Sequence, residues 1–421
     1  MKIDIKHKIN CIRKGEIPEG YFKIGNNIIP DDWEMKKVKD VVISIVGGGT
    51  PSRSKSEYYG GNIPWATVKD LSEDNYKEST IEYITLEGLE NSSSKLIEKE
   101  NFIISTRMGL GRGFINKVPM AINQDLKGIY VNKELVDIRF FMYWFKSLKD
   151  YIDNLGNGST VKGINLQTLR SLDFRLTSIE EQQNISEILS TWDKAIELKE
   201  KLIEEKKKQK KGLMQKLLTG KVRLPEFDGE WKEVKLGNVI REISDKTTEN
   251  NQYQVLTSSR QGIFLQEEYF KKSVASSNNI GYKIIKKGQF TYRTMSDDGS
   301  FKFNRLTEYE DGIVSPAYVV FEAIKINPVF LINLMDDYSF NQHIQKETQG
   351  GTRLSLKYNA LKEFVIRIPS VDEQDSIANV LNTADKAIQL YQKELEALRL
   401  QKKGLMQLLL TGIVRVNTQE K

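Results

Sequence analysis

The sequence predicts an α+β protein in which two mixed α/β globular segments alternate with two long helices that form an antiparallel coiled coil. Three observations support this prediction. The decapeptide KGLMQKLLTG at residues 211–220 returns almost unchanged as KGLMQLLLTG at residues 403–412. Each copy ends a stretch of about 40 residues with helical periodicity. Each such stretch follows a segment of short β-branched or aromatic runs broken by Gly, Asn and Ser.

The repeat extends well beyond the decapeptide. A shift of 192 positions aligns residues 158–223 with residues 350–415 without a gap. Both copies contain the segment Asp-Lys-Ala-Ile, at residues 193–196 and 385–388. An ungapped register of this length indicates a duplication, so whatever the first copy builds is expected twice.

Each copy carries the start and stop signals of one helix. Ser178 is followed three positions later by Glu181, which predicts a capping box, and Ser370 with Glu373 repeats the signal. Gly220 and its counterpart in the second copy predict the positions where the helices stop. A helix of about 40 residues is roughly 60 Å long.

Apolar residues recur every three to four positions along both helices and form one contact face on each. These residues are Ile185, Leu189, Trp192, Ile196, Ile203, Leu213 and Leu217 in the first helix, and Ile377, Leu381, Ile388, Leu395, Leu405 and Leu409 in the second. An apolar stripe on a charged rod cannot stay exposed, so we expect the two helices to pack against each other. The alternative is that each helix only closes the globular segment before it. The polar stretch EEKKKQKKG at residues 204–212 disfavours that alternative.

The globular segments share a frame but differ in content. Each opens on a tryptophan, Trp33 or Trp231, that precedes apolar positions leading into a strand. Between these openings and the duplicated ends, the two segments diverge almost completely. A duplicated frame with unlike contents suits a protein that positions two different readers.

Composition excludes several classes of function. The chain of 421 residues has no apolar run long enough to span a membrane and no secretory signal at its N-terminus, so a cytoplasmic protein is expected. Its one cysteine, Cys11, cannot form an internal disulfide. With only His7 and His343, a histidine-based metal site or Ser/His/Asp triad is not expected. The net charge of +6 permits a polyanionic partner without requiring one.

Two stretches imitate an enzyme. The glycine-rich residues 109–113 follow a predicted strand, and GGNIPW, ending at Trp65, is similar to the Asn-Pro-Pro-aromatic motif of amino methyltransferases but lacks its second proline. A nucleotide-binding glycine turn would open a helix. Here Phe114-Ile115-Asn116 predicts another strand or turn. We therefore expect a tight turn that presents Arg107 and Arg112, no catalytic residue and no metal ligand.

Loops rich in Arg, Lys, Ser, Thr, Asn, Gln and aromatic residues are the candidate DNA contacts, because such side chains can read base edges. The candidates are Thr50, Ser52, Arg53, Tyr59, Thr67, Lys69, Arg107, Arg112 and Gln124 in the first segment, and Ser259, Arg260, Gln261, Tyr292, Arg293, Lys302, Arg305 and Arg353 in the second. Any single one of them is more often an ordinary surface residue, so the prediction rests on the density of such residues on glycine-containing loops. The repeated Gly-x-Thr at Gly158 and Gly350 leaves two interpretations open, phosphate contact or a simple chain turn.

Together these features resemble the specificity subunit of type I restriction-modification systems. The resemblance rests on the Trp-x(4)-Val or Leu openings, GGNIPWATVKDL, ISTRMGLG with AINQDLKGI, and GSTVKGIN…SIEEQ…LSTWDKAI…KGLMQKLLTG. In the second half IGYKIIKKGQFTY and DGIVSPAYVVF look like a different target recognition domain of the same family. The resemblance covers nearly the whole chain.

The resemblance implies a first target recognition domain at residues 1–178, a helical spacer at 179–223, a second recognition domain at 224–369 and a second spacer at 370–421. Each recognition domain is expected to read one half of a bipartite, asymmetric site in double-stranded DNA, with the helices as a ruler. The subunit itself holds no cofactor. It is expected to recruit two modification subunits that use S-adenosylmethionine, and restriction subunits that use ATP and Mg²⁺.

Two rival hypotheses remain at this stage. A stand-alone amino methyltransferase acting on DNA would use residues 109–113 and 62–65. A coiled-coil scaffold would use its globular ends to bind proteins rather than DNA.

Overall fold

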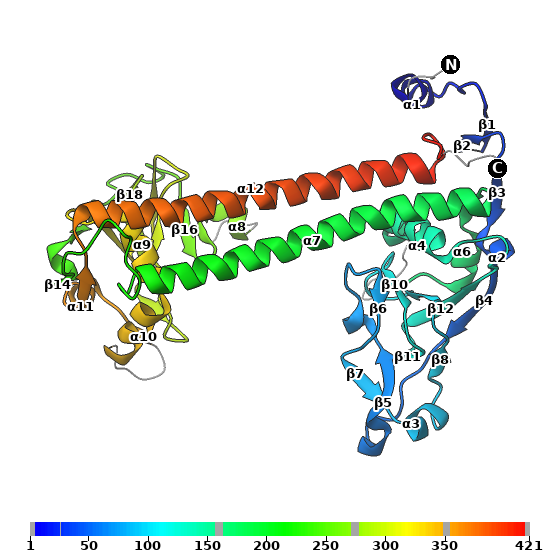
Figure 1. Cartoon of the computed structure of the whole chain (residues 1–421), viewed down its shortest axis with the longest axis horizontal. Coiled ribbons are helices and arrows are strands. Elements are labelled where there is room, and N and C mark those ends of the chain that lie inside the picture. Colours follow the sequence, from blue (N-terminus) through cyan, green and yellow to red (C-terminus); the bar gives the residue numbers. More distant parts are fainter. Residues whose placement is uncertain (1–4, 26, 156–162, 271–277, 348–353, 417–421) are drawn as a thin grey trace. The chain divides into compact units, whose positions relative to one another are not determined.

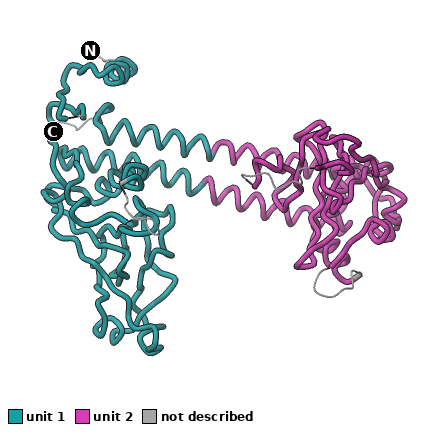
Figure 2. The backbone as a smooth tube through the Cα atoms, turned by 180° about the vertical axis from the view of Figure 1, so that it is seen from behind, with its two compact units in different colours: residues 1–198, 395–421 teal, residues 199–394 magenta. Residues whose placement is uncertain are grey.

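The computed structural model describes residues 5–25, 27–155, 163–270, 278–347 and 354–416. The chain divides into two compact units, shown in Figure 2: unit 1 comprises residues 1–198 and 395–421, and unit 2 comprises residues 199–394. The two long helices are α7 (Ile179–Leu217) and α12 (Val371–Leu410), and each passes from one unit into the other. No helix among the described residues is long and apolar enough to cross a membrane.

Within each unit, α7 and α12 lie side by side and run in opposite directions (Figure 1). In unit 1, Asp193 of α7 pairs with Lys402 of α12. In unit 2, Lys210 of α7 pairs with Asp385 of α12, so a later residue of one helix meets an earlier residue of the other. The predicted α+β fold with an antiparallel helix pair is confirmed.

The part of unit 1 between β3 (Glu34–Lys37) and α4 (Ile138–Ser147) is built on two sheets. One has the strand order β4-β12-β9-β10-β6 and the other β7-β5-β11-β8. Their strands are β4 (Val42–Gly47), β5 (Tyr59–Ala66), β6 (Tyr76–Lys77), β7 (Glu82–Ile84), β8 (Lys95–Ile97), β9 (Phe102–Ser105), β10 (Gly113–Asn116), β11 (Met120–Ile122) and β12 (Leu126–Val131). Short helices η1 (Ser56–Tyr58), η2 (Val68–Asp70) and α3 (Leu86–Glu90) connect them, while α1 (Ile5–Arg13), β1 (Tyr21–Ile24) and β2 (Asn27–Pro30) precede them.

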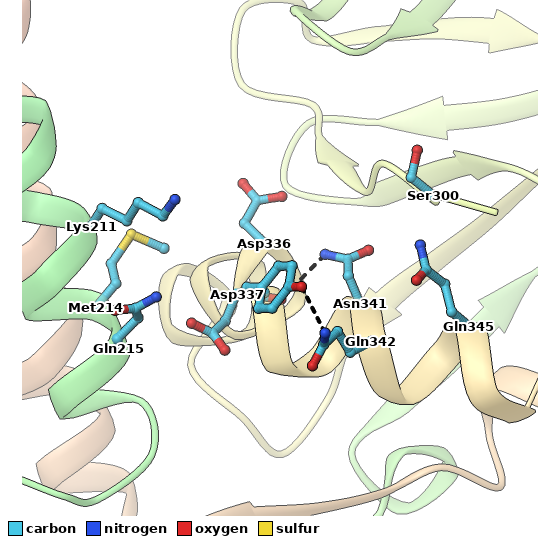
Figure 3. A pocket seen from close by; sticks show the side chains of 10 residues that line it. Lys211, Met214, Gln215, Ser300, Asp336, Asp337, Asn341, Gln342 and Gln345 are labelled. Carbon is cyan, nitrogen blue, oxygen red and sulfur yellow. Dashed lines mark hydrogen bonds between the residues drawn. The ribbon is translucent and has the colours of Figure 1, made fainter. Parts of the chain in front are cut away.

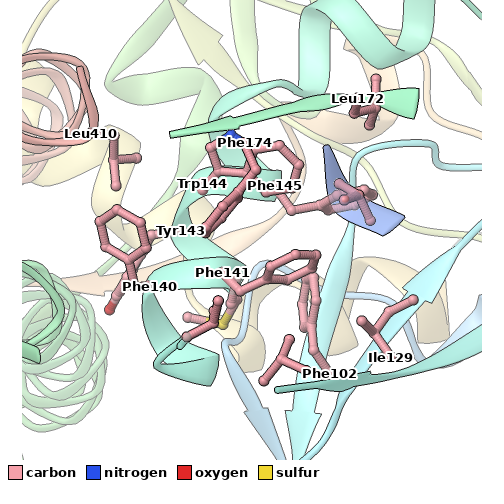
Figure 4. Close-up of a cluster of buried hydrophobic side chains, with 14 of the residues drawn as sticks. Phe102, Ile129, Phe140, Phe141, Tyr143, Trp144, Phe145, Leu172, Phe174 and Leu410 are labelled. Atoms are coloured by element: carbon pink, nitrogen blue, oxygen red, sulfur yellow. The ribbon is translucent and has the colours of Figure 1, made fainter. Parts of the chain in front are cut away.

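The core of unit 1 surrounds α4 (Ile138–Ser147). Six consecutive residues of this helix, Phe140–Phe145, are buried, so it has neighbours on every side (Figure 4). Phe102 of the sheet and Phe174 both pack edge-on against aromatic rings of α4. Leu410 of α12 belongs to the same cluster, which makes the helix pair part of the core of this unit.

Unit 2 has a smaller sheet with the strand order β15-β23-β19-β21, accompanied by three two-stranded pairs, β16-β17, β18-β22 and β20-β24. The strands are β15 (Ile240–Ile243), β16 (Leu256–Ser259), β17 (Gly262–Leu265), β18 (Lys283–Lys286), β19 (Phe290–Arg293), β20 (Met295–Ser296), β21 (Asn304–Arg305), β22 (Asp311–Val314), β23 (Tyr318–Ala323) and β24 (Leu354–Ser355). Helix α8 (Gln266–Phe270) follows β17. The sheets of the two units therefore differ in strand number and order.

Around these unlike sheets, one frame occurs twice. In each unit the strand after the opening tryptophan pairs antiparallel with the strand before the long helix, and short helices of matching order lie between them. Unit 1 uses β3 (Glu34–Lys37), α2 (Val38–Val41), α4, α5 (Lys149–Leu155), α6 (Leu166–Ser171) and β13 (Asp173–Leu176). Unit 2 uses β14 (Lys232–Lys235), η3 (Leu236–Asn238), α9 (Pro328–Asp336), α10 (Tyr338–Glu347), α11 (Tyr358–Leu361) and β25 (Val365–Ile368). The prediction of a duplicated frame is confirmed.

The enzyme-like stretches have structural roles. Gly109 and Gly111 have φ of 87° and 74°, which favours glycine, and the chain then enters β10 instead of a helix. Trp65 is buried in β5, and its Nε1 donates to the carbonyl oxygen of Gly49 at 3.2 Å. The predicted tight turn is confirmed, and the turn offers no helix N-terminus for a phosphate or a methyl donor.

Candidate nucleic-acid interface

The predicted contact faces of α7 and α12 carry no exposed residue. Ile185, Leu189, Ile203, Leu217, Ile377, Leu381, Ile388 and Leu409 are buried, and Trp192, Ile196, Leu213, Leu395 and Leu405 are half-buried. The ends of the faces lie in the cores of the units. Leu409 belongs to the core of unit 1 and Leu217 to that of unit 2, so each repeated decapeptide completes the core of a unit other than the one in which its helix begins. Closing a core and packing helix on helix are therefore both functions of these faces.

The helix ends follow the predicted signals with one difference. The backbone N–H of Glu181 donates to Ser178 Oγ at 3.2 Å, and Glu373 does the same to Ser370 at 3.4 Å. Gly220 and Gly412 end the helices with φ of 68° and 74°. The glutamate side chains do not complete a capping box, because both accept hydrogen bonds from an arginine beyond the end of the other helix.

This arginine–glutamate contact occurs once in each unit. We call the contact in unit 1 clasp 1. In it, Glu181 accepts hydrogen bonds from Arg415 Nε at 2.8 Å and from Trp33 Nε1 at 3.0 Å. The Arg415 guanidinium lies 5.7 Å from the ring centroid of Trp33 and also donates to Asp32 at 2.6 and 2.7 Å. Burial opposes ionisation of Glu181, but hydrogen bonds from Arg415 and Thr177 outweigh it and lower the pKa of this carboxyl.

Clasp 2, in unit 2, has the same composition with fewer bonds. Glu373 accepts from Arg223 Nε at 2.6 Å and from Nη2 at 2.7 Å, and the guanidinium lies 5.9 Å from the centroid of Trp231. Trp231 Nε1 is buried and has no hydrogen-bond partner among the described residues. The sequence indicated Trp33 and Trp231 as equivalent openings of the two segments, but nothing in it indicated that each lies beside an arginine from beyond the end of a long helix.

A polar joint connects α7 to the rest of unit 1. Asp193, which pairs with Lys402, also accepts from Tyr143 Oη at 2.6 Å and from Asn75 Nδ2 at 2.7 Å. Lys146 Nζ donates to Asn75 Oδ1 at 2.6 Å. Burial, together with the positive charge of Lys402, lowers the pKa of Lys146 to about 8.

On unit 1, one group of candidate DNA contacts surrounds Arg53. Its Nη1 donates to Glu82 Oε2 at 2.5 Å, and its guanidinium lies 4.5 Å from the centroid of Tyr59 and 5.1 Å from that of Trp65. Lys69 Nζ lies 3.8 Å from the same carboxylate. The Glu82 hydrogen bond raises the pKa of Arg53. More than half of the Arg53 side chain stays accessible, so this cation is oriented and still available to a ligand.

A second group joins two loops of unit 1. Thr50 Oγ1 donates to Gln124 Oε1 at 2.5 Å, and the Gln124 carbonyl accepts from Lys127 Nζ at 2.9 Å. Arg107 lies 3.9 Å from the neighbouring carboxylate of Asp125. Burial and the charge of Arg107 lower the pKa of Lys127. The structure thus brings Thr50, Arg107 and Gln124 into one cluster.

Other unit 1 candidates lie apart from these groups. Ser52 is exposed and its hydroxyl lies 2.8 Å from that of Ser54. Arg112 lies 3.9 Å from Glu73. Thr67 is buried and turned onto Asp70, so its hydroxyl holds the turn of η2 and is withdrawn from the surface.

On unit 2, several of the candidates line one groove of about 640 Å³. Its walls are formed by the tip of the β16–β17 hairpin, by α8 and by the loop that follows β19. The lining includes five of the candidates, Ser259, Arg260, Gln261, Arg293 and Lys302, together with Tyr269, Phe270, Met295, Asp297, Asp298 and Ser300. The two exposed rings of α8 are in T-shaped contact at 4.9 Å. Cationic, hydroxyl, amide and aromatic groups therefore converge here.

The prediction for Tyr292 is wrong. Its side chain is 0% exposed and packs on Phe303 with 4.8 Å between ring centroids. Burial raises its pKa far above the usual tyrosine range. Arg305 is half-buried and its Nε donates to the carbonyl oxygen of Gly288 at 3.2 Å, outside the groove. Arg353, with Gly158 and Gly350, lies outside the described residues.

A second hollow of unit 2, about 370 Å³, lies between α7 and the α9–α10 pair (Figure 3). Lys211 and Gln215 of α7 face the side-chain amides of α10 across it. Its lining has two carboxylates, Asp336 and Asp337, against one cation, whereas the groove around Arg260 has three cations beside its two carboxylates. The excess of negative charge would repel phosphate groups. We therefore leave this hollow out of the candidate DNA interface. The described residues also contain no group of three His, Cys, Asp or Glu side chains suited to a metal ion.

Comparisons with known proteins all point to type I restriction-modification systems. A family model described as the type I restriction modification DNA specificity domain matches residues 30–207 and again residues 228–400. The MjaVIII specificity subunit of Methanocaldococcus jannaschii is 25% identical over 92% of this chain and 94% of that protein. The MjaIX specificity subunit of the same organism is 34% identical, over 41% of this chain and 40% of its own length. A solved structure titled as the basis of complex assembly and conformational transition of the type I R-M system has a similar fold, with a TM-score of 0.60 and 13% identity over 92% of this chain and 99% of that one.

Glu181→Ala is expected to lower the free energy of unfolding more than Glu373→Ala, by about 1 kcal/mol or more. Both variants leave an arginine without its glutamate, but only Glu181→Ala also leaves Trp33 Nε1 and the Thr177 hydroxyl unpaired. Urea unfolding followed by circular dichroism measures the difference. Glu181→Gln, which keeps an acceptor oxygen, serves as the control and should lose less. Equal losses at the two clasps would contradict the assignment.

The stability of the chain should rise with pH between about 8 and 10.5 through Lys146. Its folded-state pKa is below the unfolded value, so the unfolded chain binds more protons in that window and raising the pH favours folding. Lys146→Met should remove a gain on the order of 1 kcal/mol between pH 7.5 and 9.5. Urea unfolding at both pH values tests this, with Lys149→Met, on the exposed side of the same region, as the control. An unchanged pH dependence in Lys146→Met would contradict the prediction.

Proposed function

The chain belongs to the family of type I restriction-modification specificity subunits, the non-catalytic component that selects DNA, and from this premise we propose that its two halves read the two parts of a bipartite, asymmetric DNA site. The observation that carries the proposal is a duplicated frame around unlike sheets. A shared frame presents both readers to DNA by the same means. Unlike readers bind unlike half-sites, so the complete site is not a palindrome.

The proposed domains follow the boundaries drawn from the sequence. Residues 1–178 and 224–369 are the recognition domains, and residues 179–223 and 370–421 are the spacers. The unit 1 groups around Arg53 and Gln124 and the unit 2 groove offer exposed cations beside hydroxyl and amide groups. Cations bind phosphates in any sequence, whereas the hydrogen-bonding groups distinguish bases.

We propose that the helix pair sets the distance between the half-sites. A continuous helix of 39 residues measures roughly 58 Å. Two sites on one face of B-DNA lie about 34–36 Å apart for one helical turn, which such a rod is long enough to set. Two clasps and three cross-helix ion pairs, Lys199–Glu394, Lys210–Asp385 and Lys402–Asp193, resist sliding of one helix along the other. A rod that cannot slide implies one fixed gap length.

The helix pair also offers matched surfaces for the modification subunits. Leu198 of α7 and Leu390 of α12 occupy equivalent repeat positions and are 56% and 55% exposed. One turn earlier each has the same exposed lysine, Lys194 or Lys386. These side chains are not needed for packing the two helices together. We propose that each leucine enters an apolar depression on one copy of the modification subunit, and that acidic residues around this depression face the neighbouring lysine.

The remaining parts of the proposal concern the assembled enzyme. The modification subunits would supply S-adenosylmethionine-dependent adenine methylation, and restriction subunits would use ATP and Mg²⁺ to translocate and cleave DNA. The chain itself would hold none of these cofactors. The complex would act in the cytoplasm, where the DNA lies.

The direct test is to co-express the chain with its modification subunit in a host lacking adenine methylation and to map methylated adenines across the genome. The expected result is one motif with two unlike halves and a single gap length, since the readers differ and the spacer is rigid. Cells that lack the chain but contain the modification subunit are the control. A continuous motif, or a motif with a variable gap, would contradict the proposal.

Leu198→Glu and Leu390→Glu should each prevent the binding of one of the two modification subunits, and the double variant should prevent the binding of both. A buried carboxylate without a partner costs several kcal/mol, so each contact should weaken at least about 100-fold. Analytical ultracentrifugation of the complexes gives the stoichiometry. Leu400→Glu is the matched control, because Leu400 is 72% exposed on α12 but its repeat counterpart is a lysine. Loss of subunits in Leu400→Glu, or full binding in the double variant, would sink the docking assignment.

A further inference from the structure

We propose that Arg260 reads a guanine in the half-site bound by unit 2 and that Asp298 is its positioning residue. The inference rests on the proposed function, since it assigns a base and two roles within the groove described above. Arg260 lies in the turn that joins β16 to β17, and 73% of its side chain is accessible. It therefore combines exposure with a defined direction.

The direction of Arg260 is set by the loop after β19. Arg260 Nη2 donates to Asp298 Oδ2 and to Ser300 Oγ, the latter at 3.1 Å. The other oxygen of Asp298 accepts from Ser296 Oγ at 2.9 Å and from the Ser300 hydroxyl and backbone N–H at 2.7 and 3.1 Å. Every one of these bonds favours the ionised carboxylate, and they hold the pKa of Asp298 below its usual range.

The loop that carries Asp298 is itself closely packed. Gly299 has φ of 76°, which favours glycine, and a Cβ there would lie 2.8 Å from Leu354 Cδ1. A larger residue would require the Leu354 side chain or the loop to shift. The carboxylate that holds Arg260 is thus fixed by both backbone conformation and packing.

The hairpin that carries Arg260 is anchored from beneath. Asn304 Nδ2 donates to Ser258 Oγ at 2.7 Å and to the carbonyl oxygen of Ser259 at 2.8 Å. Asn304 is buried, so these bonds are shielded from water. Arg260 is consequently held at both ends, at its backbone by Asn304 and at its guanidinium by Asp298.

An arginine held in this way suits a base better than a phosphate. A phosphate accepts from a cation in almost any direction, whereas the O6 and N7 of guanine require a guanidinium in a defined plane. Among the described residues only Asp298 and Ser300 accept from Arg260, and both use Nη2, which leaves the donors of Nη1 and Nε for a base. A carboxylate next to the backbone of DNA lowers affinity, so its position here is explained by orientation and not by attraction.

Arg293 is the internal comparison. It lines the same groove and is exposed, but no hydrogen bond or ion pair holds its side chain among the described residues. An unheld cation is suited to a phosphate, where charge matters more than direction. Arg260 and Arg293 should therefore differ in what they contribute, although their chemistry is identical.

The test maps adenine methylation in cells that contain the modification subunit and Arg260→Lys, Arg293→Lys or Asp298→Asn. Lysine keeps the charge and loses the planar fork. Arg260→Lys should reduce the preference for guanine at one position of one half-site about 10-fold, which corresponds to about 1.4 kcal/mol. The other half-site and the gap should stay unchanged. Asp298→Asn should relax the same position to a smaller extent, and Arg293→Lys should leave the motif as it is.

The outcomes separate the inference from the function on which it rests. An unchanged motif in Arg260→Lys, or an equal relaxation in Arg293→Lys, would overturn the inference while the bipartite motif of the unaltered chain upholds the function. Absence of a bipartite motif with the unaltered chain would overturn the function itself. Because Arg260 is largely exposed, its replacement should leave the thermal midpoint within about 2 °C, and an intact unaffected half-site reports that the variant is folded.

Discussion

The structure depends on the antiparallel contact between α7 and α12, because each helix begins in the core of one unit and ends in the core of the other. The apolar faces supply the burial in this contact, and charge pairs across it add direction. Lys210–Asp385 and Lys402–Asp193 are equivalent pairs in the repeat, and both lie at half-buried positions where solvent screens them only in part. An apolar stripe alone permits neighbouring registers, whereas opposite charges at fixed levels penalise a slip of one turn. The register of the pair is therefore specified twice by one duplicated sequence.

The duplication explains which residues the two halves share. The identical residues at the repeat ends form the clasps, because the arginine of one copy meets the glutamate of the other. A change in either residue would disturb a partner that lies far away in the sequence. The sheets carry no such constraint, since their strands pair only within one unit. They could diverge while the frame stayed the same, and this freedom would allow one chain to hold the two different readers that we propose.

Much of the frame could be predicted from the sequence because it rests on local signals. Serine at the helix start, glycine at the helix end and a regular apolar stripe each act within a few residues, and all were found where expected. The prediction that Tyr292 is accessible was wrong because β19 lies between β23 and β21 in the sheet. Three of the four residues of β19 are buried, so its side chains do not alternate between a buried and an exposed face. The clasps and the carboxylates beside Arg53 and Arg260 could not be predicted, because their partners are up to 383 positions apart along the chain.

Those carboxylates also show that the two units hold an exposed arginine by different means. Arg53 is held by Glu82 and by the faces of Tyr59 and Trp65, whereas Arg260 is held by Asp298 and a hydroxyl. If both surfaces contact DNA as we propose, each arrangement places a negative charge opposite a polyanion and so reduces non-specific attraction. A DNA-binding protein that must find a few specific sites among very many others benefits from weaker non-specific attraction. Its specificity is the ratio of specific to non-specific affinity, and this ratio rises when the non-specific affinity falls. Restraint of the two arginines by acids is therefore consistent with the discrimination that we propose for the two units.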